Sequence, residues 1–262
     1  MNLHLDTRLA LVTASTKGIG FAIARSLARE GARVVINGRT DASVDDAVQR
    51  IRSEVPEAQL ERCAGDLGTA DGVNRLVAAF PDVDVLVNNL GIFEPKPFED
   101  IPDADWLHFF EVNVLSGVRL SRAYIGAMKR RNWGRVVFIS SESGIQIPVE
   151  MIHYGTTKTA QLAVSRGLAE SCAGTGVTVN AVLPGPTASE GVVELVRQVS
   201  GGQSFDDFQA EFFKSVRPSS LLKRFETPDE IAHLVTFVCS PLASGITGAA
   251  LRADGGVVRA AF

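Results

Sequence analysis

The stretch RLALVTASTKGIG, from Arg8 to Gly20, decides the fold of this chain. Its first six residues are a short apolar run of the kind that forms a buried strand, and its last seven are a glycine-rich turn. Apolar residues then follow at helical spacing until Gly31, a typical end signal for a helix. The turn also suits a dinucleotide, because its backbone can approach a pyrophosphate at the positive end of the helix. A tight strand-to-helix connection is the plain alternative, and the flanking strand and helix favour the dinucleotide site.

The same alternation of strand and helix continues along the chain. Further strands are predicted at residues 33–37, 58–63, 83–87, 134–141, 176–183 and 248–254, and helices at 41–55, 69–80, 103–131, 151–173 and from 228 onward. We expect Thr227 to cap the last of these helices, with Pro228 in its first turn. No repeat, low-complexity tract or linker interrupts them. We therefore predict an α/β fold with one doubly wound parallel sheet of about seven strands flanked by helices, formed by a single domain over residues 1–262.

Residues 189–218 depart from this alternation. They contain Ser200-Gly201-Gly202 and, beyond it, several phenylalanines among charged residues. We interpret them as one or two short helices joined by a hinge, which form a helical lid over residues 187–220 that covers a pocket. A contact between subunits and an ordinary pair of surface helices explain this composition equally well.

Composition and charge exclude several classes of function. Of the 262 residues, 45% are hydrophobic and 21% are charged, which is enough for one large core. The net charge of -4 argues against a nucleic-acid partner, which requires a basic surface. No apolar run reaches the roughly 18–20 residues of a membrane span, and the first residues lack a signal-peptide pattern, so we expect a cytoplasmic protein with no membrane partner. The three cysteines and four histidines are scattered, which predicts neither a disulfide framework nor a metal site.

Tyr154 and Lys158 are the first candidates for chemistry. Four residues apart on a predicted helix, they share one face. A free phenol has a pKa of about 10, and we expect the nearby ammonium to lower it toward neutrality. Such a phenol can give a proton to a ketone oxygen or take one from an alcohol, which is the proton half of a carbonyl redox reaction. The pair alone is also compatible with a half-buried tyrosine beside a solvated lysine. The predicted dinucleotide site favours the redox interpretation.

The end of the second strand bears on the choice of cofactor. It reads Asn37-Gly38-Arg39-Thr40 and lacks the acidic residue that holds the ribose hydroxyls in NAD sites. Arg39 offers a planar donor fork suited to a 2′-phosphate, and Lys17 in the turn is expected to approach the same group. The two residues favour NADP(H) over NAD(H). Two ordinary surface cations are the alternative, and Asp41 keeps NAD(H) open, although we expect it to cap the next helix.

Polar residues follow other strands as well. Asp66, with Leu67 beside it, is expected either to accept a hydrogen bond from the adenine or to cap a turn. Asn88-Asn89-Leu90-Gly91 follows the fourth strand, where it places polar groups at the carboxyl edge of the sheet. Asn113 lies within the long predicted helix, where asparagine is unfavourable, so it is either tolerated or used to disturb the helix.

Together these motifs resemble the short-chain dehydrogenase/reductase family over essentially the whole chain. The resemblance rests on the turn at 13–20, Asn88 to Gly91, Asn113, Ser141, the YGTTK stretch at 154–158, Pro184-Gly185 and Asp254-Gly255-Gly256. The sequence departs from the family pattern at Ala14, where the first glycine of the turn is usual, and at Leu90, where alanine is usual. We expect Ala14 to hold the turn with a negative φ, and Leu90 to narrow the space near the nicotinamide.

The resemblance implies a Rossmann-type fold and a role for each matching residue. Tyr154 is implied as the general acid/base, with Lys158 lowering its pKa and binding the nicotinamide ribose. Ser141, thirteen residues before the tyrosine, is implied rather than Ser140 as the donor to the substrate oxygen. Asn113 is implied to seat a water for proton relay. The implied cofactor-binding residues are Thr13, Ser15, Thr16, Lys17, Gly18, Ile19, Gly20, Arg39, Asp66, Leu67, Asn89, Gly91, Ile139, Tyr154, Lys158, Pro184, Gly185 and Thr187.

The family implies an oxidoreductase that transfers a hydride between NADP(H) and a ketone or secondary alcohol, and a homotetramer or homodimer. A 3-oxoacyl-thioester reductase of the acyl-carrier-protein type is the alternative. The basic residues that would have to bind the carrier are Lys129, Arg130, Arg131 and Arg135, and a solvated helix end explains this cluster as well. A catalytically silent NADP(H)-binding sensor is a third hypothesis, of a different class. We expect the substrate preference to depend on residues that flank the pocket, namely Glu142, Gln146, Met151 and His153.

Overall fold

The stretch from Arg8 to Gly20 folds into the expected strand, turn and helix. In the computed structural model, which describes residues 2–199 and 204–261, strand β1 (Leu9–Val12) leads through a turn into helix α1 (Gly18–Arg29). β1 is almost wholly buried, because helices cover both faces of a parallel sheet. α1 places Phe21, Ile23 and Leu27 against the sheet, as its apolar spacing predicts.

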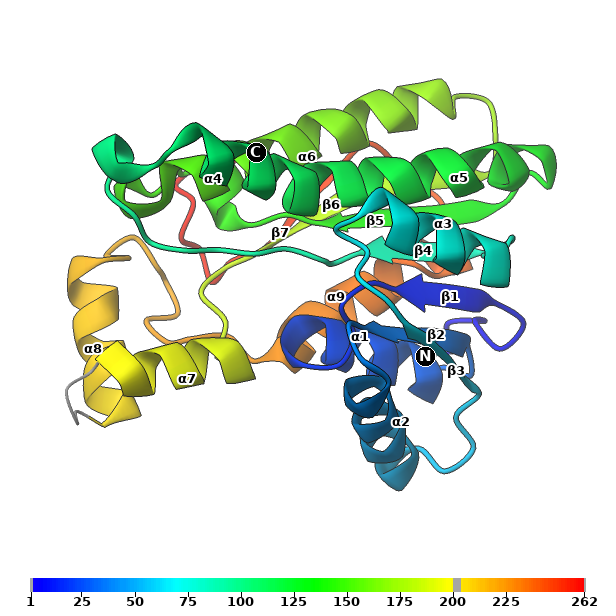
Figure 1. Cartoon of the computed structure of the whole chain (residues 1–262), viewed down its shortest axis with the longest axis horizontal. Coiled ribbons are helices and arrows are strands. Elements are labelled where there is room, and N and C mark those ends of the chain that lie inside the picture. Colours follow the sequence, from blue (N-terminus) through cyan, green and yellow to red (C-terminus); the bar gives the residue numbers. More distant parts are fainter. Residues whose placement is uncertain (1, 200–203, 262) are drawn as a thin grey trace.

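Within the described residues, seven parallel strands form one sheet in the order β3-β2-β1-β4-β5-β6-β7 (Figure 1). The order reverses between β1 and β4, and the carboxyl edge at such a reversal is where α/β folds bind ligands. The prediction of a doubly wound parallel sheet is therefore confirmed. The strands after β1 are β2 (Arg33–Gly38), β3 (Leu60–Ala64), β4 (Val85–Asn88), β5 (Gly134–Ile139), β6 (Val177–Pro184) and β7 (Ala250–Ala253).

Helices cover the two faces of the sheet as separate layers (Figure 1). Ala10 and Val12 of β1 pack toward α1, α2 (Asp41–Glu54) and α9 (Pro228–Val238). Leu11, between them, packs toward α3 (Ala70–Ala79), α5 (Ser116–Arg130) and α6 (Ile152–Ser171). This alternation follows from the two-residue period of a strand, and it buries a hydrophobic core on each side.

The long helix predicted at 103–131 is interrupted around Asn113. α4 (Asp103–Phe110) and α5 are separated by a π-helical turn at Glu111–Leu115, in which the Ser116 N–H bonds to the Glu111 carbonyl five residues back. Of the two readings of Asn113, disturbance of the helix is therefore the one that the structure supports. A wide turn of this kind frees a backbone carbonyl, and that of Asn113 accepts a hydrogen bond from Gln161 Nε2 at 2.5 Å.

Two capping predictions have different outcomes. Thr227 begins α9 with its hydroxyl on the backbone of Glu230, the Glu230 carboxylate bonds back, and Pro228 occupies the first turn, as expected. Asp41 was expected to cap α2, which is wrong. Thr40 is the cap, because its hydroxyl accepts from Ser43 N at 3.3 Å, and Asp41 is the first helical residue.

Two helices occupy the region predicted as a lid. α7 (Glu190–Val199) and α8 (Phe205–Ser215) stand apart from both layers, beyond the carboxyl ends of the strands (Figure 1). The hinge predicted at 200–202 lies outside the described residues. The phenylalanines of α8 pack mainly on Phe225, with ring centroids 5.0–6.5 Å apart. They therefore fix α8 to the segment before α9. None of the described helices combines the length and the apolar character needed to cross a membrane.

Candidate active site

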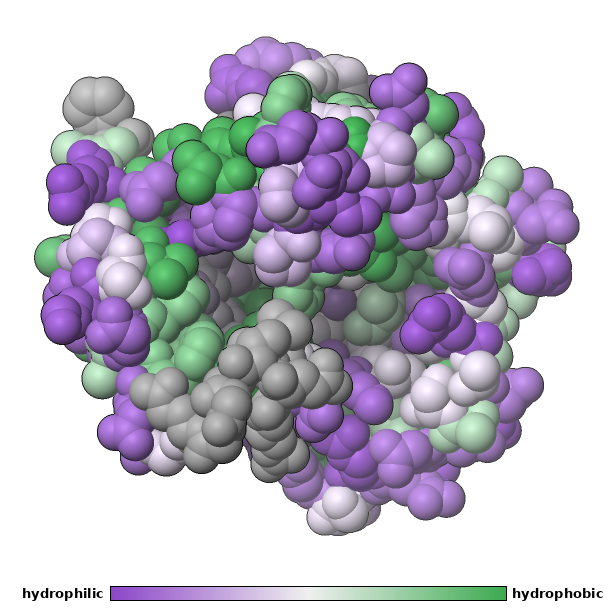
Figure 2. All heavy atoms as spheres, turned by 60° about the vertical axis from the view of Figure 1, so that its left-hand side comes forward, coloured by the Kyte–Doolittle hydropathy of each residue, from purple (hydrophilic) through white to green (hydrophobic). Residues whose placement is uncertain are grey.

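A cavity of about 490 Å³ lies at the carboxyl edge of the sheet. Its walls come from the ends of β5 and β6, from the loop after β4, from the start of α6 and from α7 and α8. Figure 2 shows apolar residues around a hollow on the face that carries α7 and α8, and polar residues toward the periphery. The predicted residues that line the cavity are Ile19, Asn89, Gly91, Ile139, Ser141, Tyr154, Lys158, Pro184, Gly185 and Thr187.

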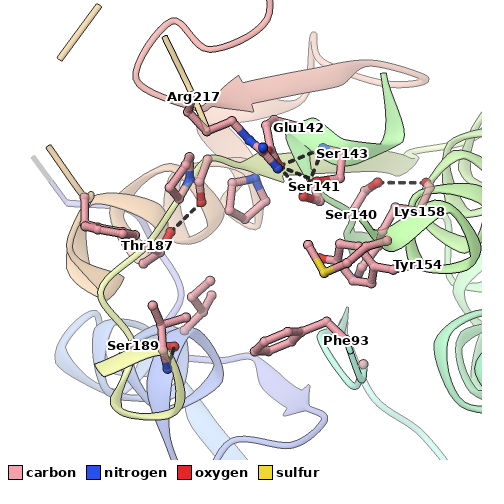
Figure 3. A pocket seen from close by; sticks show the side chains of 18 of the residues that line it. Phe93, Ser140, Ser141, Glu142, Ser143, Tyr154, Lys158, Thr187, Ser189 and Arg217 are labelled. Carbon is pink, nitrogen blue, oxygen red and sulfur yellow. Dashed lines mark hydrogen bonds and ion pairs between the residues drawn. The ribbon is translucent and has the colours of Figure 1, made fainter. Parts of the chain in front are cut away.

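Tyr154, Lys158 and Ser141 converge on this cavity (Figure 3). Tyr154 and Lys158 lie on the first turns of α6, with the lysine Nζ 5.5 Å from the centre of the phenol ring. Ser141 follows β5 and forms a hydrogen bond with the phenol. Ser140 has a different role, since its hydroxyl donates to the Lys158 carbonyl at 2.8 Å. The spacing argument for Ser141 over Ser140 therefore agrees with the hydrogen bonds.

The expected low pKa of Tyr154 is wrong for this structure. Burial raises the pKa of the phenol well above its usual range; the contact with Ser141 lowers this pKa, the Glu142 carboxylate raises it and Arg217 lowers it. Lys158 does not reverse the effect of burial. Its Nζ donates to the Ile139 carbonyl at 2.9 Å and to Gln161 Oε1 at 3.4 Å, and burial lowers its own pKa to about 8. Sequence spacing indicated that the two groups are neighbours, but not how deeply they are buried.

Asn113 and Gly91 complete the surroundings of the lysine. A Cβ at Gly91 would lie 3.3 Å from Lys158 Nζ and 3.4 Å from Asn113 Oδ1, so a side chain there would press on the lysine ammonium. The Asn113 side chain bonds the backbone of Ile92 in both directions, at 2.8 and 3.0 Å, and donates to Thr157 Oγ1 at 3.0 Å. Asn113 thus joins the loop after β4 to α6. Its implied role in a water relay stays a prediction.

Polar side chains hold the glycine-rich turn in place. Asn37 Oδ1 accepts from Ala14 N at 3.0 Å, and Ser15 Oγ accepts from Asn37 N at 2.9 Å. Thr13 Oγ1 accepts from the backbone of Asn89 at 2.8 Å. The buried hydroxyls of Thr13 and Ser15 are therefore engaged within the protein, and their role in cofactor binding stays a prediction. We had not predicted the role of Asn37, because an asparagine that ends a strand has no distinctive sequence signal.

The backbone of Ala14 corrects a further expectation. Its φ is 49°, in the left-handed region, and not negative as expected. Glycine is usual at this position because the turn requires that conformation, and alanine adopts it at a cost. Gly20 has a different reason to be glycine: a Cβ there would collide with the Ala14 carbonyl and with the Asn89 side chain.

The remaining predicted cofactor residues lie outside the cavity wall. Lys17, the N-cap of α1, and Arg39, just after β2, are both exposed. Asp66 Oδ1 accepts from Gly68 N at 2.9 Å, which is the turn-capping alternative. Leu67 is buried in the core, so only its backbone can reach a cofactor. Thr16, Gly18 and Gly20 belong to the turn and to the start of α1.

A carboxylate meets the start of α1. Glu190, the first residue of α7, accepts from Gly18 N at 3.0 Å through Oε2 and pairs with Arg50 at 2.8 Å through Oε1. This backbone N–H belongs to the helix end that the sequence predicts for a pyrophosphate. The contact spans 172 residues of sequence, so local reasoning had no means to find it.

The predicted specificity residues divide into two groups. Glu142 and Met151 line the cavity, whereas Gln146 does not belong to its wall. His153 is fully buried, 4.0 Å from the Phe109 ring, so it also does not face the substrate space. Leu90 was expected to narrow the space near the nicotinamide, which is wrong, because it packs against the core on the α5 side.

Sequence reasoning missed Arg217, which follows α8 and lines the cavity. Its Nε bonds Glu142 Oε1 at 3.0 Å, and its Nη1 lies 3.4 Å from Glu150 Oε1. Figure 3 shows the guanidinium pointing at Glu142 beside Ser141. A single arginine in an irregular segment has no sequence signal, and its partners lie 75 and 67 residues away.

Comparison with known proteins agrees with this geometry. A family model described as enoyl-(acyl carrier protein) reductase matches residues 13–258. Dehydrogenase/reductase SDR family member 4 of Bos taurus is 34% identical over 96% of this chain and 88% of its own length. This chain belongs to the short-chain dehydrogenase/reductase family. The resemblance stated from the motifs is therefore confirmed, and the protein is an oxidoreductase of this family.

Two further proteins are similar to this chain in sequence or in structure. The uncharacterized oxidoreductase YvaG of Bacillus subtilis is 52% identical over the full length of both chains. The crystal structure of L-sorbose reductase from Gluconobacter frateurii, in complex with NADPH and L-sorbose, superposes with a TM-score of 0.92. It is 26% identical and covers 99% of this chain and 100% of its own.

Proposed function

We propose that this protein transfers a hydride between NADP(H) and a ketone or secondary alcohol, with Tyr154 as the general acid/base. The observation that carries the proposal is the convergence of Tyr154, Ser141 and Lys158 on one cavity at the carboxyl edge of the sheet. A reactive oxygen placed there has a phenol and a hydroxyl within reach of each other, beside a buried ammonium.

The residues present fit a nicotinamide dinucleotide. The start of α1 offers backbone N–H groups to a pyrophosphate, and Asn89 and Gly91 border the cavity beside this turn. Ile139, Thr187 and Lys158 all line the cavity. The first two would contact a nicotinamide, and Lys158 would bind its ribose. The bound cofactor supplies or accepts the hydride. Lys17 and Arg39 support NADP(H) over NAD(H), as does the NADPH in the L-sorbose reductase complex.

Side chains of the protein supply the proton that the reduction of a ketone requires. Because burial raises the pKa of Tyr154, the phenol keeps its proton at neutral pH, which is the form that protonates a ketone oxygen during reduction. Ser141 would hold that oxygen next to the phenol. Lys158 and Asn113 border the same space at Gly91, and we assign them the delivery of a replacement proton.

The substrate side of the cavity favours a neutral ketone with an apolar substituent. Phe93, Met151, Phe208 and Phe212 line it. The alternative, an acyl-carrier-protein thioester, agrees with the description of the family model, but the basic cluster that would have to bind the carrier is poorly placed for it. Arg135 is 2% exposed, Arg131 pairs with Asp82, and both lie near the amino end of β5, at the opposite edge of the sheet from the cavity. The expected homotetramer or homodimer stays a prediction.

Tyr154→Phe tests the role of the phenol. We expect turnover of a panel of ketones with NADPH to fall about 10²- to 10⁴-fold, while NADPH fluorescence titration shows unchanged binding. Tyr124→Phe is a matched control, because its hydroxyl donates to the Phe80 carbonyl inside the core. If the wild type binds NADPH but turns over no member of a broad panel, the sensor hypothesis is favoured, and equal rates in Tyr154→Phe would refute the role of the phenol.

Arg39→Asp tests the choice of cofactor. The wild type should prefer NADP to NAD, and the substitution should erase or reverse that preference, because a carboxylate repels the 2′-phosphate and accepts from ribose hydroxyls. Arg33→Asp, at the opposite end of β2, should leave the ratio of kcat/KM values unchanged. Equal use of both cofactors by the wild type would contradict the assignment of Lys17 and Arg39.

A further inference from the structure

An ion pair is buried in the wall of the cavity beside the Ser141 hydroxyl. It joins Arg217 Nε to Glu142 Oε1 at 3.0 Å, and the two side chains are 9% and 6% exposed. Glu142 directly follows Ser141, whereas Arg217 comes from the segment after α8. Burial of two charges is costly even when they are paired, so a buried pair against a reactive hydroxyl calls for a functional explanation.

The second carboxylate oxygen of Glu142 is saturated with donors. Oε2 accepts from Ser141 Oγ at 2.5 Å, from Ser143 N at 2.7 Å and from Ser143 Oγ at 2.9 Å (Figure 3). An ionised carboxylate only accepts hydrogen bonds, so the Ser141 hydroxyl must direct its proton at Glu142. In return, Ser143 N donates to Ser141 Oγ at 3.1 Å. Glu142 thereby fixes both the position and the direction of this hydroxyl.

Charged side chains from several elements lie around the phenol. Glu142 and Arg217 act on Tyr154 with opposite signs, Glu142 raising the phenol pKa and Arg217 lowering it. Lys158 lies 5.5 Å from the ring, and Glu150 reaches Arg217 from the opposite side at 3.4 Å. Arg217 also donates to the Val216 carbonyl at 3.1 Å. The guanidinium is therefore shared between two carboxylates, and only one of these contacts Ser141.

We propose that Glu142 and Arg217 are paired positioning residues, in which the carboxylate orients the Ser141 hydroxyl and the guanidinium offsets the charge of that carboxylate next to Tyr154. The inference rests on the proposed roles of Tyr154 and Ser141. A carboxylate without its partner would retain the Ser141 proton against the substrate oxygen and would oppose formation of a phenolate. The positive charge of Arg217 weakens both effects of the carboxylate.

The test uses three variants of the full chain: Glu142→Gln, Arg217→Met and the double variant. Their rates of alcohol oxidation with NADP are measured against pH. Arg217→Met leaves the carboxylate uncompensated, so the rising limb should shift to higher pH by about one unit, and Glu142→Gln should shift it by a similar amount to lower pH. The double variant should return close to the wild-type profile. Arg217→Lys keeps the charge and should restore the profile of Arg217→Met toward that of the wild type.

A purely structural ion pair would behave differently. It would lower kcat in both single variants without moving their pH profiles in opposite directions, and that outcome would overturn the proposal. Asp45 and Arg62 form an exposed pair between α2 and β3 and provide the control. Asp45→Asn and Arg62→Met, singly and together, should leave the profile unchanged.

A second measurement needs no substrate. The chain has two tyrosines, Tyr124 and Tyr154, so in a Tyr124→Phe background ring-carbon NMR reports Tyr154 alone. At the highest pH at which all three proteins stay folded, the tyrosinate fraction should rank Glu142→Gln above the parent and the parent above Arg217→Met. Equal fractions in all three would contradict the pairing. This ranking remains measurable if no ketone is turned over, so failure of the pairing can be told from failure of the proposed reaction.

Discussion

Ala14 is a residue with a strained backbone in the glycine-rich turn. Its φ of 49° places an L-residue in the conformation that glycine adopts freely. The strain is tolerated because Asn37 and Asn89 bond the backbone on both sides of the residue, at 3.0 and 3.2 Å. The turn is thus held by polar side chains in place of the conformational freedom of a glycine.

Ala14→Gly should therefore stabilise the protein. The left-handed conformation costs alanine about 1–2 kcal/mol, part of which is offset by the greater freedom of glycine in the unfolded chain, so we expect a gain of about 1 kcal/mol in unfolding free energy. Urea denaturation measures it. Ala123→Gly, at an exposed position within α5, should lose a similar amount. A loss in both variants would show that the turn is not strained.

For single residues, the sequence predicted which side chains lie together, but not how their surroundings shift their pKa values. Tyr154, Lys158 and Ser141 are brought together as the motif spacing implies. The pKa of Tyr154 was predicted in the wrong direction, because it depends on burial and on Glu142 and Arg217. Burial depends on elements distant in sequence, and Arg217 arrives from a segment with no regular pattern.

Among the elements, α7 bears most directly on cofactor binding. Its first residue, Glu190, places a carboxylate on the Gly18 N–H and is held there by Arg50. A pyrophosphate at this helix end would meet a like charge on the same donor. Either the Glu190 carboxylate moves away from Gly18 when the cofactor binds, or the carboxylate and the pyrophosphate lie close together at the positive end of α1.

Glu190→Gln should tighten the binding of NADPH. Removal of the like charge is expected to lower Kd several-fold at low ionic strength and less at high salt, because salt screens the repulsion. Fluorescence titration at two salt concentrations measures both effects. Glu211→Gln on α8, whose carboxylate lies 3.9 Å from Lys214, is the control. Weaker binding in Glu190→Gln would show that the carboxylate supports the turn instead of competing with the ligand.

Helices and strands were predicted well where local signals decide them. Thr227 and Pro228 begin α9 as expected, since a cap and a first-turn proline act within a few residues. The break at Glu111–Leu115 could be suspected from Asn113, but not located, because it depends on bonds to Ile92 and Thr157. The phenylalanines of α8 were assigned to the pocket, and Phe208 and Phe212 do line it, although much of their surface packs on Phe225.

For the molecule as a whole, Glu226 connects stability to pH. It is 5% exposed, beneath the loop Pro184–Thr187, and its Oε2 accepts from Gly185 N at 3.2 Å. Burial, with Glu230 and Asp254 nearby, raises its pKa to about 7, while the Gly185 bond and Arg224 oppose this shift. The folded state therefore binds this proton more tightly than the unfolded state does. The resulting stability is complete below the usual carboxyl pKa and is lost as pH rises through about 7.

Glu226→Gln should remove this dependence. Between pH 5 and pH 8 the wild type should lose about 2 kcal/mol of unfolding free energy relative to the variant, because only the wild type must bury a charge at the higher pH. Urea melts at several pH values measure the difference. Glu57→Gln, at an exposed position after α2, should run parallel to the wild type. A constant difference between wild type and Glu226→Gln would contradict a buried, titrating carboxyl.

The topology of the whole molecule could be predicted from the sequence, because few arrangements are compatible with the alternation of strands and helices. Strands that alternate with helices form a parallel sheet with right-handed crossovers, and the glycine-rich turn after the first strand marks the binding edge. The predicted strands, including those of 33–37 and 134–141, all pair in this sheet. The contacts of Glu190 and Arg217 join residues that are far apart in the sequence. No local sequence pattern indicates them, so they could not be predicted without the structure.

The wide turn at Glu111–Leu115 has a consequence for attempts to raise the thermal stability of this enzyme. Deleting one residue there would restore continuous α-helical bonding, yet it would rotate one half of the helix by about 100° against the other and carry Asn113 away from Ile92. The gain in helical bonding and the loss of the Asn113 bonds to Ile92 and Thr157 would then act in opposite directions on the free energy of unfolding. The residue that widens the turn is therefore one that a stabilisation programme should leave in place, since its removal detaches the loop after β4 from α6.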